Sequence, residues 1–323
     1  MNSSDSKSQI LAEIEKLQIR LAGLERKERK SSPRVPTETQ MKNIREFERR
    51  ASTGEDEAPL VEYIELEDLV GTEVFESVLK NEQRRETHCF EVRGQSIQYY
   101  TPNLRSLWQS AGQEYIEPEL LDFIDGIPID GVFFDVGAST GVFAMYAALK
   151  GKMTVCFEPE VANFEILNTN SFLNHKKIKN NFLAVNVALS NEKTISEMYI
   201  RKFEGAAHEK VLGKSEGRVG TSSFAADYIQ SVITVSMDEF CDFSSIVPTD
   251  IKVDVDGAEL AVIEGMRNSL SNPTLKRIFI EISENDESSI LALNSILASG
   301  FVVHKRTRVQ NYFTEYNYIL HRV

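Results

Sequence analysis

The second half of the chain alternates between short apolar runs and longer segments with helical spacing. Strands are expected at Val132–Val136, Met153–Phe157, Phe182–Ala188, Ile251–Val255, Arg277–Ile282, Phe301–His304 and Tyr312–His321. Helices are expected at Val142–Leu149, Ala162–Leu173, Glu259–Leu270 and Ser288–Ser299. Apolar strands that alternate with helices predict an α/β fold with a doubly wound, mostly parallel sheet over residues 126–323. The last two strands are joined by a short loop, so they are expected to form an antiparallel C-terminal hairpin.

The region before this pattern is different in character. Ile10, Ile14, Leu17, Leu21 and Leu24 recur at alternating steps of four and three, with charged residues between them. This is the a/d spacing of a coiled coil, and it predicts a helical arm over residues 1–30. The arm is either a short coiled coil that makes a homo-oligomer through residues 8–30, or a solvated or docked amphipathic helix.

Between the arm and the sheet, residues 31–59 are polar and interrupted by proline and glycine, as is typical of a linker. Residues 60–125 are expected to form a helix-and-hairpin cap. Its predicted elements are a helix at Val61–Lys80, a hairpin of Cys89–Val92 and Ser96–Tyr100, and a helix at Glu117–Ile124.

Charge and cysteine content narrow the class of protein. Lys and Arg number 36 against 49 Asp and Glu, which gives a net charge of −13. Phosphate binding needs concentrated positive charge, so no nucleic-acid partner is expected. Three scattered cysteines without a CxxC pair argue against a zinc site or a disulfide framework. No signal-peptide pattern and no uninterrupted apolar segment of spanning length is seen, which predicts a cytoplasmic protein without a membrane span.

The sharpest motif is Val132-Phe-Phe-Asp-Val-Gly-Ala-Ser-Thr-Gly141, an apolar strand that runs into a glycine turn and a helix. Such a turn brings backbone N–H groups and a helix N-terminus to a ligand. A dinucleotide fingerprint needs glycine where Ser139 and Val142 stand, and the lysine of a phosphate-binding loop is also missing. S-adenosylmethionine binding fits better. The predicted cofactor-binding residues of the turn are Asp135, Gly137, Ala138, Ser139 and Gly141.

A second acidic residue supports that interpretation. Glu158, followed by Pro159, comes directly after the strand Met153–Phe157, about 20 residues beyond the glycine turn. A carboxylate at this position can accept hydrogen bonds from both ribose hydroxyls, and Glu158 and Pro159 are therefore counted as cofactor-binding. The structural alternative is that Glu158 is an acid at the start of the helix that Pro159 opens.

Two other functions remain open. Gly137-Ala-Ser-Thr-Gly141 matches the GxSxG nucleophile elbow, so an α/β-hydrolase could use Ser139 with an aspartate and either His304 or His321. Few strands precede the elbow, which weighs against this. The third alternative is a non-catalytic coiled-coil scaffold with a degenerate cofactor domain.

Several carboxylates follow the later strands and are expected to share one edge of the sheet. Asp254 closes the apolar run Ile251–Val255, and Glu281 lies near the end of the next strand. Because a buried acid needs a partner, Asp254 is the first candidate for a general base or substrate contact and Glu281 the second. Asp256-Gly-Ala-Glu259 has the spacing of a capping box.

Two further features are ambiguous. The glycine-rich stretch Phe203–Phe224, which includes His208, is either a substrate lid or a surface excursion. The aromatic residues of the cap are expected either to fill its core or to form a face on which sugars stack. These residues are Tyr99, Tyr100, Trp108 and Tyr115.

From about Glu117 to Val323 the sequence resembles the FkbM family of class I methyltransferases. The resemblance rests on Asp135-Val-Gly-Ala-Ser-Thr-Gly141, Phe157-Glu-Pro159 with Asn163, Leu167, Asn170 and Asn174, Val187-Ala-Leu-Ser190, Val235-Ser-Met-Asp-Glu-Phe240 and Ile251-Lys-Val-Asp-Val-Asp-Gly-Ala-Glu259. Ser139 and Asp256 depart from the family's more common Asn and Glu. The resemblance implies a Rossmann-like fold and S-adenosylmethionine-dependent O-methylation of a small-molecule or glycan acceptor, often a sugar or secondary metabolite.

A metal is a secondary consideration. Asp254 and Asp256 are similar to the paired acids of magnesium-dependent catechol-type methyltransferases, and oxygen ligands suit Mg²⁺. Their spacing is not diagnostic, so no residue is assigned as a metal ligand.

Overall fold

The computed structural model describes residues 73–82, 86–207, 210–213, 225–309 and 314–323, and the single positions 38, 42 and 45. The chain divides into two units, Met1–Glu76 and Ser77–Val323. Helix α4 is described over Glu73–Glu82. The a/d seam Ile10–Leu24 and His208 lie outside the described residues, as does the linker over residues 31–59 apart from positions 38, 42 and 45, and all three stay predictions.

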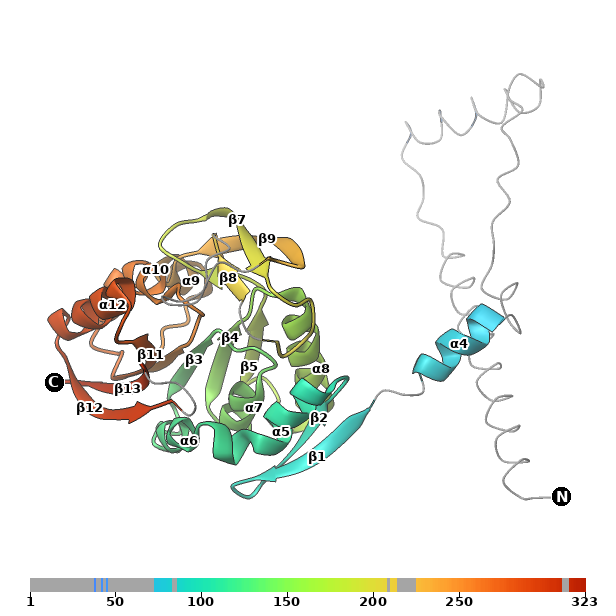
Figure 1. Cartoon of the computed structure of the whole chain (residues 1–323), viewed down its shortest axis with the longest axis horizontal. Coiled ribbons are helices and arrows are strands. Elements are labelled where there is room, and N and C mark those ends of the chain that lie inside the picture. Colours follow the sequence, from blue (N-terminus) through green and yellow to red (C-terminus); the bar gives the residue numbers. More distant parts are fainter. Residues whose placement is uncertain are drawn as a thin grey trace. The chain divides into compact units, whose positions relative to one another are not determined.

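The main sheet has seven strands in the order β12-β13-β11-β10-β3-β4-β5 (Figure 1). Its strands are β3 (Val132–Val136), β4 (Met153–Phe157), β5 (Phe182–Val185), β10 (Asp250–Val253), β11 (Arg277–Ser283), β12 (Phe301–Arg308) and β13 (Glu315–Arg322). Strand β13 runs antiparallel to both neighbours, while β11, β10, β3, β4 and β5 are parallel. The mostly parallel sheet with an antiparallel C-terminal hairpin is therefore confirmed. The strand order reverses between β3 and β10, where a doubly wound sheet forms its ligand crevice.

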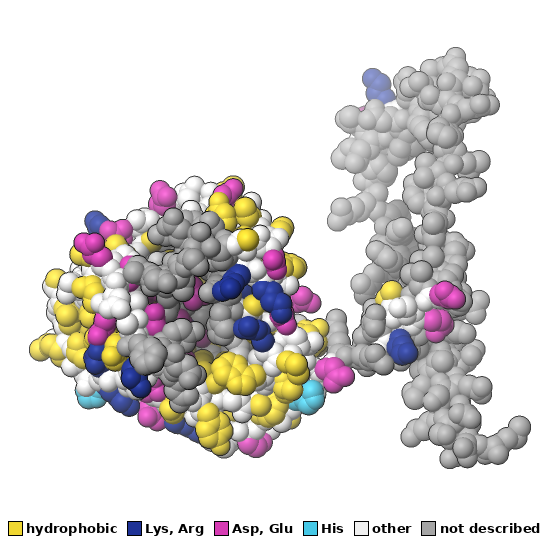
Figure 2. Space-filling model, viewed as in Figure 1, with side chains coloured by type: hydrophobic (Ala, Val, Ile, Leu, Met, Phe, Trp, Pro, Cys, Tyr) yellow, Lys and Arg dark blue, Asp and Glu magenta, His cyan; other side chains and the backbone are white. Residues whose placement is uncertain are grey.

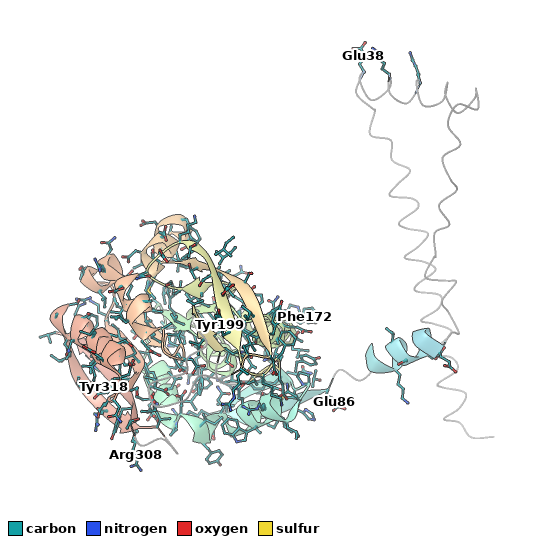
Figure 3. The ribbon with its side chains drawn as sticks, turned by 45° about the horizontal axis from the view of Figure 1, so that its top comes forward. Glu38, Glu86, Phe172, Tyr199, Arg308 and Tyr318 are labelled. Carbon is teal, nitrogen blue, oxygen red and sulfur yellow. The ribbon has the colours of Figure 1, made fainter. Side chains whose placement is uncertain are left out.

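Each face of this sheet has its own core, because alternate residues of a strand point to opposite sides. Phe134 and Ile280 lie in the core of one face, and Phe133 and Phe279 lie in the core of the other. The helices of the first face are α9 (Met237–Ser244), α10 (Glu259–Glu264), α11 (Arg267–Ser271) and α12 (Glu287–Ala298). The second face is covered by α6 (Pro118–Asp125), α7 (Val142–Leu149) and α8 (Val161–Ile178). Side chains fill both layers (Figure 3).

A smaller sheet, in the order β6-β9-β7-β8, was not predicted. Its strands are β6 (Ala188–Leu189), β7 (Thr194–Ile200), β8 (Lys210–Leu212) and β9 (Tyr228–Val235). The predicted strand Phe182–Ala188 is in fact divided between the two sheets. Asn186 lies between the two segments, and its side chain donates to the carbonyl oxygens of Glu158 and Pro159 at 2.8 and 3.1 Å.

The cap begins with the predicted hairpin, β1 (Thr87–Val92) and β2 (Gln95–Tyr100), and continues into α5 (Leu104–Ile116) and α6. Helix α5 was not predicted. Arg93 in the hairpin turn contacts Asp122 and Asp125 of α6, both at 2.9 Å. The hairpin is thereby fastened to the helix that covers the main sheet.

The aromatic residues of the cap separate into two groups. Tyr99 is fully buried, as the core interpretation predicts. Trp108 and Tyr115 on α5 are 56% and 76% exposed, so the core interpretation is wrong for them. Figure 2 shows other hydrophobic side chains at the surface of the described region, interspersed with charges of both signs.

The predicted helix Glu259–Leu270 consists of two shorter helices, α10 and α11. The break falls at Gly265, where an added Cβ would lie 2.0 Å from the carbonyl oxygen of Ser190. The close approach of Ser190 requires glycine at this position, and the backbone leaves the helical conformation at the next residue, Met266, with φ of −122° and ψ of 30°. Among the helices that the structure describes, none is long and apolar enough to cross a membrane.

Candidate active site

The turn between β3 and α7 follows the ends of two parallel strands. Gly137 N and Ala138 N both donate to the carbonyl oxygen of Phe157 at the end of β4, at 3.0 and 3.1 Å. The backbone is left-handed at Gly137, Ser139 and Gly141, with φ of 77°, 52° and 78°. The turn is thus tied to β4 in the conformation that the glycine motif predicts.

Two of its glycines also permit close packing. A Cβ on Gly137 would lie 1.8 Å from the carbonyl oxygen of Asp254, just beyond β10. A Cβ on Gly141 would lie 2.9 Å from Cγ of Leu167 on α8. The turn therefore fills the place where the strand order reverses, and any larger residue at position 137 would displace β10.

Glu158 holds the turn from the side of β4. Its Oε2 accepts the N–H of Ser139 at 2.7 Å and its Oε1 accepts the N–H of Glu160 at 2.9 Å. Burial raises the pKa of Glu158 to about 7, against the lowering effect of Lys210 and of these two N–H groups. A carboxylate has about four lone-pair positions, so further donors can still bind it.

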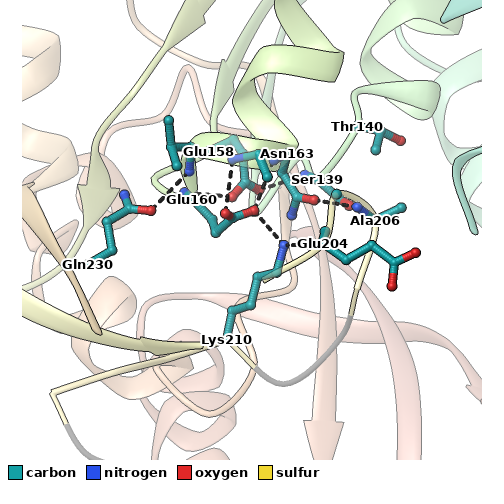
Figure 4. Close-up of polar contacts among 12 residues, drawn as sticks. Ser139, Thr140, Glu158, Glu160, Asn163, Glu204, Ala206, Lys210 and Gln230 are labelled. Carbon is teal, nitrogen blue, oxygen red and sulfur yellow. Dashed lines mark hydrogen bonds and ion pairs between the residues drawn. The ribbon is translucent and has the colours of Figure 1, made fainter. Parts of the chain in front are cut away.

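The helix cap that the sequence suggested for Glu158 belongs to Glu160. The side chain of Glu160 is fully buried and accepts the N–H groups of Ala162 and Asn163, both at 2.9 Å. It also pairs with Lys210 of β8 at 2.5 Å. Figure 4 shows this ion pair beside Glu158. Strand β8 is thereby joined to the start of α8, close to the glycine turn.

A buried lysine organises the opposite side of the turn. Lys252 of β10 is level with Asp135 of β3, and its Nζ lies 3.2 Å from Asp135 Oδ1 and 3.4 Å from Asp254 Oδ2. It also donates to the carbonyl oxygen of Gly137 at 2.8 Å. Burial favours the neutral form of Lys252, but Asp135, Asp254 and Glu117 raise its pKa overall. The ammonium therefore stays charged and links the turn to both carboxylates.

Beyond Lys252, acidic groups at the carboxyl edge of the sheet lie near enough to Glu117 to act on it electrostatically. We call Glu117, Glu119, Asp254, Glu281 and Asn317 the edge cluster. Asn317 Nδ2 lies 3.0 Å from Glu119 Oε1 and 3.4 Å from Glu117 Oε1. Asn317 and Glu281 are direct register partners on β13 and β11, so their side chains share one face. Burial raises the pKa of Glu117 to about 8, and the charges of Asp254, Glu281 and Glu119 add to the rise.

The structure brings most of the predicted site residues together around the turn. Asp135, Gly137 and Asp254 meet through Lys252, and Ser139 and Glu158 meet through a hydrogen bond. Ala138 is buried within the turn. The carbonyl of Pro159 instead accepts the side-chain amide of Gln230, at 2.7 Å. Glu281 lies in the edge cluster.

The hydrolase interpretation fails on its histidines. His304 and His321 stack on each other with ring centroids 4.1 Å apart. His321 pairs with Arg277, the first residue of β11, at the amino edge of the parallel strands. Ser139 follows the carboxyl end of β3, the parallel strand two positions away. Neither histidine can therefore reach Ser139 to activate it.

The capping box is also wrong. Helix α10 begins at Glu259 and is preceded by Ala258, while Asp256 is left-handed with φ of 44°. Glu259 Oε1 instead accepts the N–H of Gly257 at 3.0 Å. The suggestion of a Mg²⁺ ion is not supported either. Within the described ranges, no three His, Cys, Asp or Glu side chains are grouped so that they could hold a metal ion.

Sequence analysis assigned no role to Lys252, Glu117 or Asn317. A signal for Lys252 was present, because a lysine inside a buried apolar strand requires a charged partner. Glu117 lies at a helix junction and Asn317 on the last strand. They meet only through the tertiary fold, and nothing near either residue in the sequence indicates the meeting.

The main sheet is Rossmann-like, with a glycine turn after its first parallel strand and an acid after its second. Sheets of this kind bind ligands in the crevice where the strand order reverses, which here lies between β3 and β10. The family described as "Methyltransferase FkbM domain" matches residues 135–320. The chain belongs to this family of methyltransferases.

Individual relatives are distant. Hexuronic acid methyltransferase AglP of Haloferax volcanii is 23% identical over 217 residues, which cover 66% of this chain and 83% of AglP. The crystal structure of methyltransferase FkbM from Methylobacillus flagellatus KT is 16% identical with a TM-score of 0.40, and the match covers 59% of this chain and 44% of that one. Aeropyrum pernix fibrillarin in complex with S-adenosyl-L-methionine is 8% identical with a TM-score of 0.40, covering 72% of this chain and 82% of fibrillarin.

Proposed function

We propose that this protein transfers a methyl group from S-adenosylmethionine to a hydroxyl group of a sugar or a sugar-containing metabolite. The observation that carries the proposal is the position of the glycine turn. Glu158 holds one side of the turn, and Lys252 with Asp254 holds the other. A donor site and an acidic acceptor site are thus adjacent at the reversal of strand order.

The residues of the turn fit the cofactor. We assign the methionine part of S-adenosylmethionine to the turn Gly137–Gly141 and to Asp135. Oδ1 of Asp135 is buried and forms no hydrogen bond among the described residues, although Lys252 lies 3.2 Å away as an ion pair. The ribose hydroxyls are assigned to the remaining lone pairs of Glu158. When bound, S-adenosylmethionine supplies an electrophilic methyl group.

The chain's own task is then to position the acceptor and to remove its proton. A hydroxyl is a weak nucleophile, and a positioned base accelerates such a reaction roughly 10²- to 10⁴-fold. Asp254 lies directly beside the turn, and Glu281 is on the adjacent strand. We assign both carboxylates to the acceptor side, where they face the edge cluster.

A sugar acceptor is suggested by one relative. AglP acts on a hexuronic acid according to its name, and it matches two thirds of this chain. Hexuronic acids and neutral hexoses both present several hydroxyl groups, so both are suitable first acceptors for this site. A hexuronic acid carries a carboxylate that a neutral hexose lacks, and a direct comparison of the two sugars tests whether the site requires that carboxylate.

Binding of S-adenosylhomocysteine tests the cofactor assignment. We expect the wild-type protein to bind it in calorimetric titration and Glu158→Gln to weaken binding roughly 30- to 150-fold, because hydrogen bonds to a charged acceptor are lost. Glu165→Gln, at an exposed position on α8, is the matched control and should bind normally. If folded wild-type protein binds no S-adenosylhomocysteine, the proposed function is wrong and the non-catalytic scaffold becomes the favoured alternative.

The acceptor is then tested with methyl-labelled S-adenosylmethionine. Nitrophenyl glucuronide and nitrophenyl glucoside are the two probes, and a protein heated to unfolding is the blank. Label in either product supports O-methylation of a sugar, and the preferred product identifies the acceptor class. Binding of the cofactor analogue without transfer to either sugar would retain the methyltransferase and reject these acceptors.

A further inference from the structure

The face of the main sheet that lies under the cap changes character toward its carboxyl edge. Phe279 and Ile319 are register partners on β11 and β13, and both belong to the core under α6 and α7. Two residues further along, the same face carries Glu281 and Asn317. An apolar layer therefore gives way to a polar layer at the edge where a doubly wound sheet binds its ligand.

The cap contributes a carboxylate to this polar layer. Glu117 is the single residue between α5 and α6, with φ of −140° and ψ of 71°. Its carbonyl oxygen accepts the N–H of Leu120 at 3.1 Å, and Pro118 opens α6. The backbone at Glu117 is therefore held by both helices. Its side chain is half-buried and lies against Asn317.

Asn317 is the second sign that a ligand binds here. Its side chain is 2% exposed, and its Nδ2 faces Glu119 and Glu117. Its Oδ1 has no hydrogen-bond partner among the described residues. A buried acceptor without a donor is costly and uncommon in proteins. A hydroxyl group from a bound molecule would satisfy it.

We propose that Glu117 and Asn317 form the acceptor subsite, in which Glu117 takes the proton of the hydroxyl that is methylated and Asn317 Oδ1 accepts a hydrogen bond from a neighbouring hydroxyl. The inference rests on the proposed function. It specifies an acceptor with two nearby hydroxyl groups, as in a sugar ring, and it places a catalytic residue in the cap, outside the matched family region 135–320.

Geometry and charge favour Glu117 over Asp254 as the proton acceptor. Asp254 lies 3.4 Å from the ammonium of Lys252, so its carboxylate is already engaged in an ion pair that also holds the glycine turn. The charged groups that act on Glu117 are Asp254 and Lys252 from β10, Glu281 from β11 and Glu119 from α6. Burial raises the pKa of Glu117 to about 8, and the acids, which outnumber the lysine, add to the rise. A base is most effective when its pKa lies near the working pH.

The step balances without another reactant. The acceptor oxygen forms a bond to the methyl carbon while the bond from that carbon to the sulfonium sulfur breaks. The sulfur keeps the electron pair and leaves as the neutral thioether of S-adenosylhomocysteine. The hydroxyl proton passes to the Glu117 carboxylate, which later releases it to water.

Glu117→Gln tests the proton transfer, with Glu114→Gln on α5, the helix that precedes Glu117, as the matched control. Glu114 accepts the N–H of Arg93 at 2.6 Å, away from the edge cluster. With the sugar that wild-type protein methylates, we expect Glu117→Gln to lower kcat/KM about 100-fold or more while affinity for S-adenosylhomocysteine is unchanged. Wild-type kcat/KM should rise with pH through about 8, and this rise should vanish in Glu117→Gln. Asn317→Ala should raise KM for the sugar about 10-fold.

A second measurement needs no acceptor. The pKa of Glu117 is raised from 4.5 to about 8 in the folded protein, so the folded state loses stability as pH rises between these values. The glutamine side chain in Glu117→Gln carries no charge, so this loss is absent from the variant. We expect wild type and Glu117→Gln to unfold at similar temperatures near pH 4.5, and the variant to unfold at a temperature several degrees higher near pH 8.

The outcomes separate the two proposals. If S-adenosylhomocysteine does not bind, the proposed function fails; if it binds but neither probe sugar is methylated, the methyltransferase is retained and these acceptors are rejected. If wild type methylates a sugar and Glu117→Gln retains its rate and pH profile, the inference about Glu117 is overturned. If no sugar is methylated, the melting temperatures still decide: a difference that does not grow with pH shows that Glu117 holds no raised proton affinity and overturns the inference.

Discussion

At the scale of single residues, the site depends on one position where no side chain fits. Gly137 is left-handed, and an added Cβ would lie 1.8 Å from the carbonyl oxygen of Asp254. Lys252 holds Gly137 close to Asp254, because its ammonium donates to the carbonyl oxygen of Gly137 and pairs with the Asp254 carboxylate. Conformation and contact both demand glycine here, and the two requirements can be separated experimentally.

Gly94 provides the comparison, because it has nearly the same φ of 78° but no atom within 4 Å of an added Cβ. Gly94→Ala should cost about 1–2 kcal/mol of unfolding free energy, from the left-handed backbone alone. Gly137→Ala should cost about 4 kcal/mol or more, or prevent folding, because β10 must also move. Urea unfolding of both variants measures the difference. Equal losses would mean that the contact with Asp254 is not tight.

At the scale of elements, side chains of helix α8 form the hydrogen bonds that a further strand would otherwise make with the outer edge of β2. Asn174 accepts the N–H of Gln98 at 3.1 Å and donates to its carbonyl at 2.7 Å. Asn170 accepts the N–H of Tyr100 at 2.7 Å and donates to the carbonyl of Thr140 at 2.8 Å. The cap hairpin, α8 and the glycine turn are thereby connected through two buried amides. An edge strand whose backbone groups are paired in this way is also protected from pairing with other chains.

Asn174→Ala would leave two backbone groups of β2 without partners. We expect a loss of about 1–3 kcal/mol in unfolding free energy and faster hydrogen exchange at the amide of Gln98. Asn191→Ala is the control, because Asn191 is exposed and its side chain bonds to the side chains of Glu264 and Ser190, at 2.8 and 3.4 Å. Unchanged exchange at Gln98 in Asn174→Ala would contradict this role for α8.

At the scale of the whole molecule, the cap and the sheet share one core. Ile97 of the hairpin and Leu120 of α6 belong to the same buried cluster as Phe133 and Tyr146. The second unit of the chain accordingly begins at Ser77, well before the first strand of the main sheet. The acceptor subsite that we propose also depends on the cap, since Glu117 comes from it.

We therefore expect a fragment of residues 77–323 to fold and to bind S-adenosylhomocysteine like the full chain. A fragment of residues 126–323, which begins at the domain boundary that the strand pattern suggests, should aggregate or unfold without cooperativity. It leaves the apolar face of the sheet that the cap covers exposed to water. Calorimetric unfolding of the two fragments checks this expectation. A stable, cooperatively folding 126–323 fragment would show that the cap is dispensable for the fold.

The limits of sequence-based prediction are clearest where two segments meet. The strands Val132–Val136 and Met153–Phe157 and the helix Val142–Leu149 have the predicted bounds, because short apolar runs and a glycine turn are local signals. The smaller sheet was missed because its strands are half-exposed and lack a continuous apolar run. The break at Gly265 was missed as well, and only the structure shows that the backbone of Ser190 lies against this glycine.

The sequence by itself determined the doubly wound sheet, the glycine turn and the acids Glu158, Asp254 and Glu281, since each depends on a pattern within a few neighbouring residues. Only the tertiary structure decided which groups act on one another. Lys252 reaches Asp135 across a strand pair, and Glu117 reaches Asn317 across most of the chain. Such pairings depend on strand order and helix packing. These bring distant segments within hydrogen-bond distance and leave no trace in the local sequence.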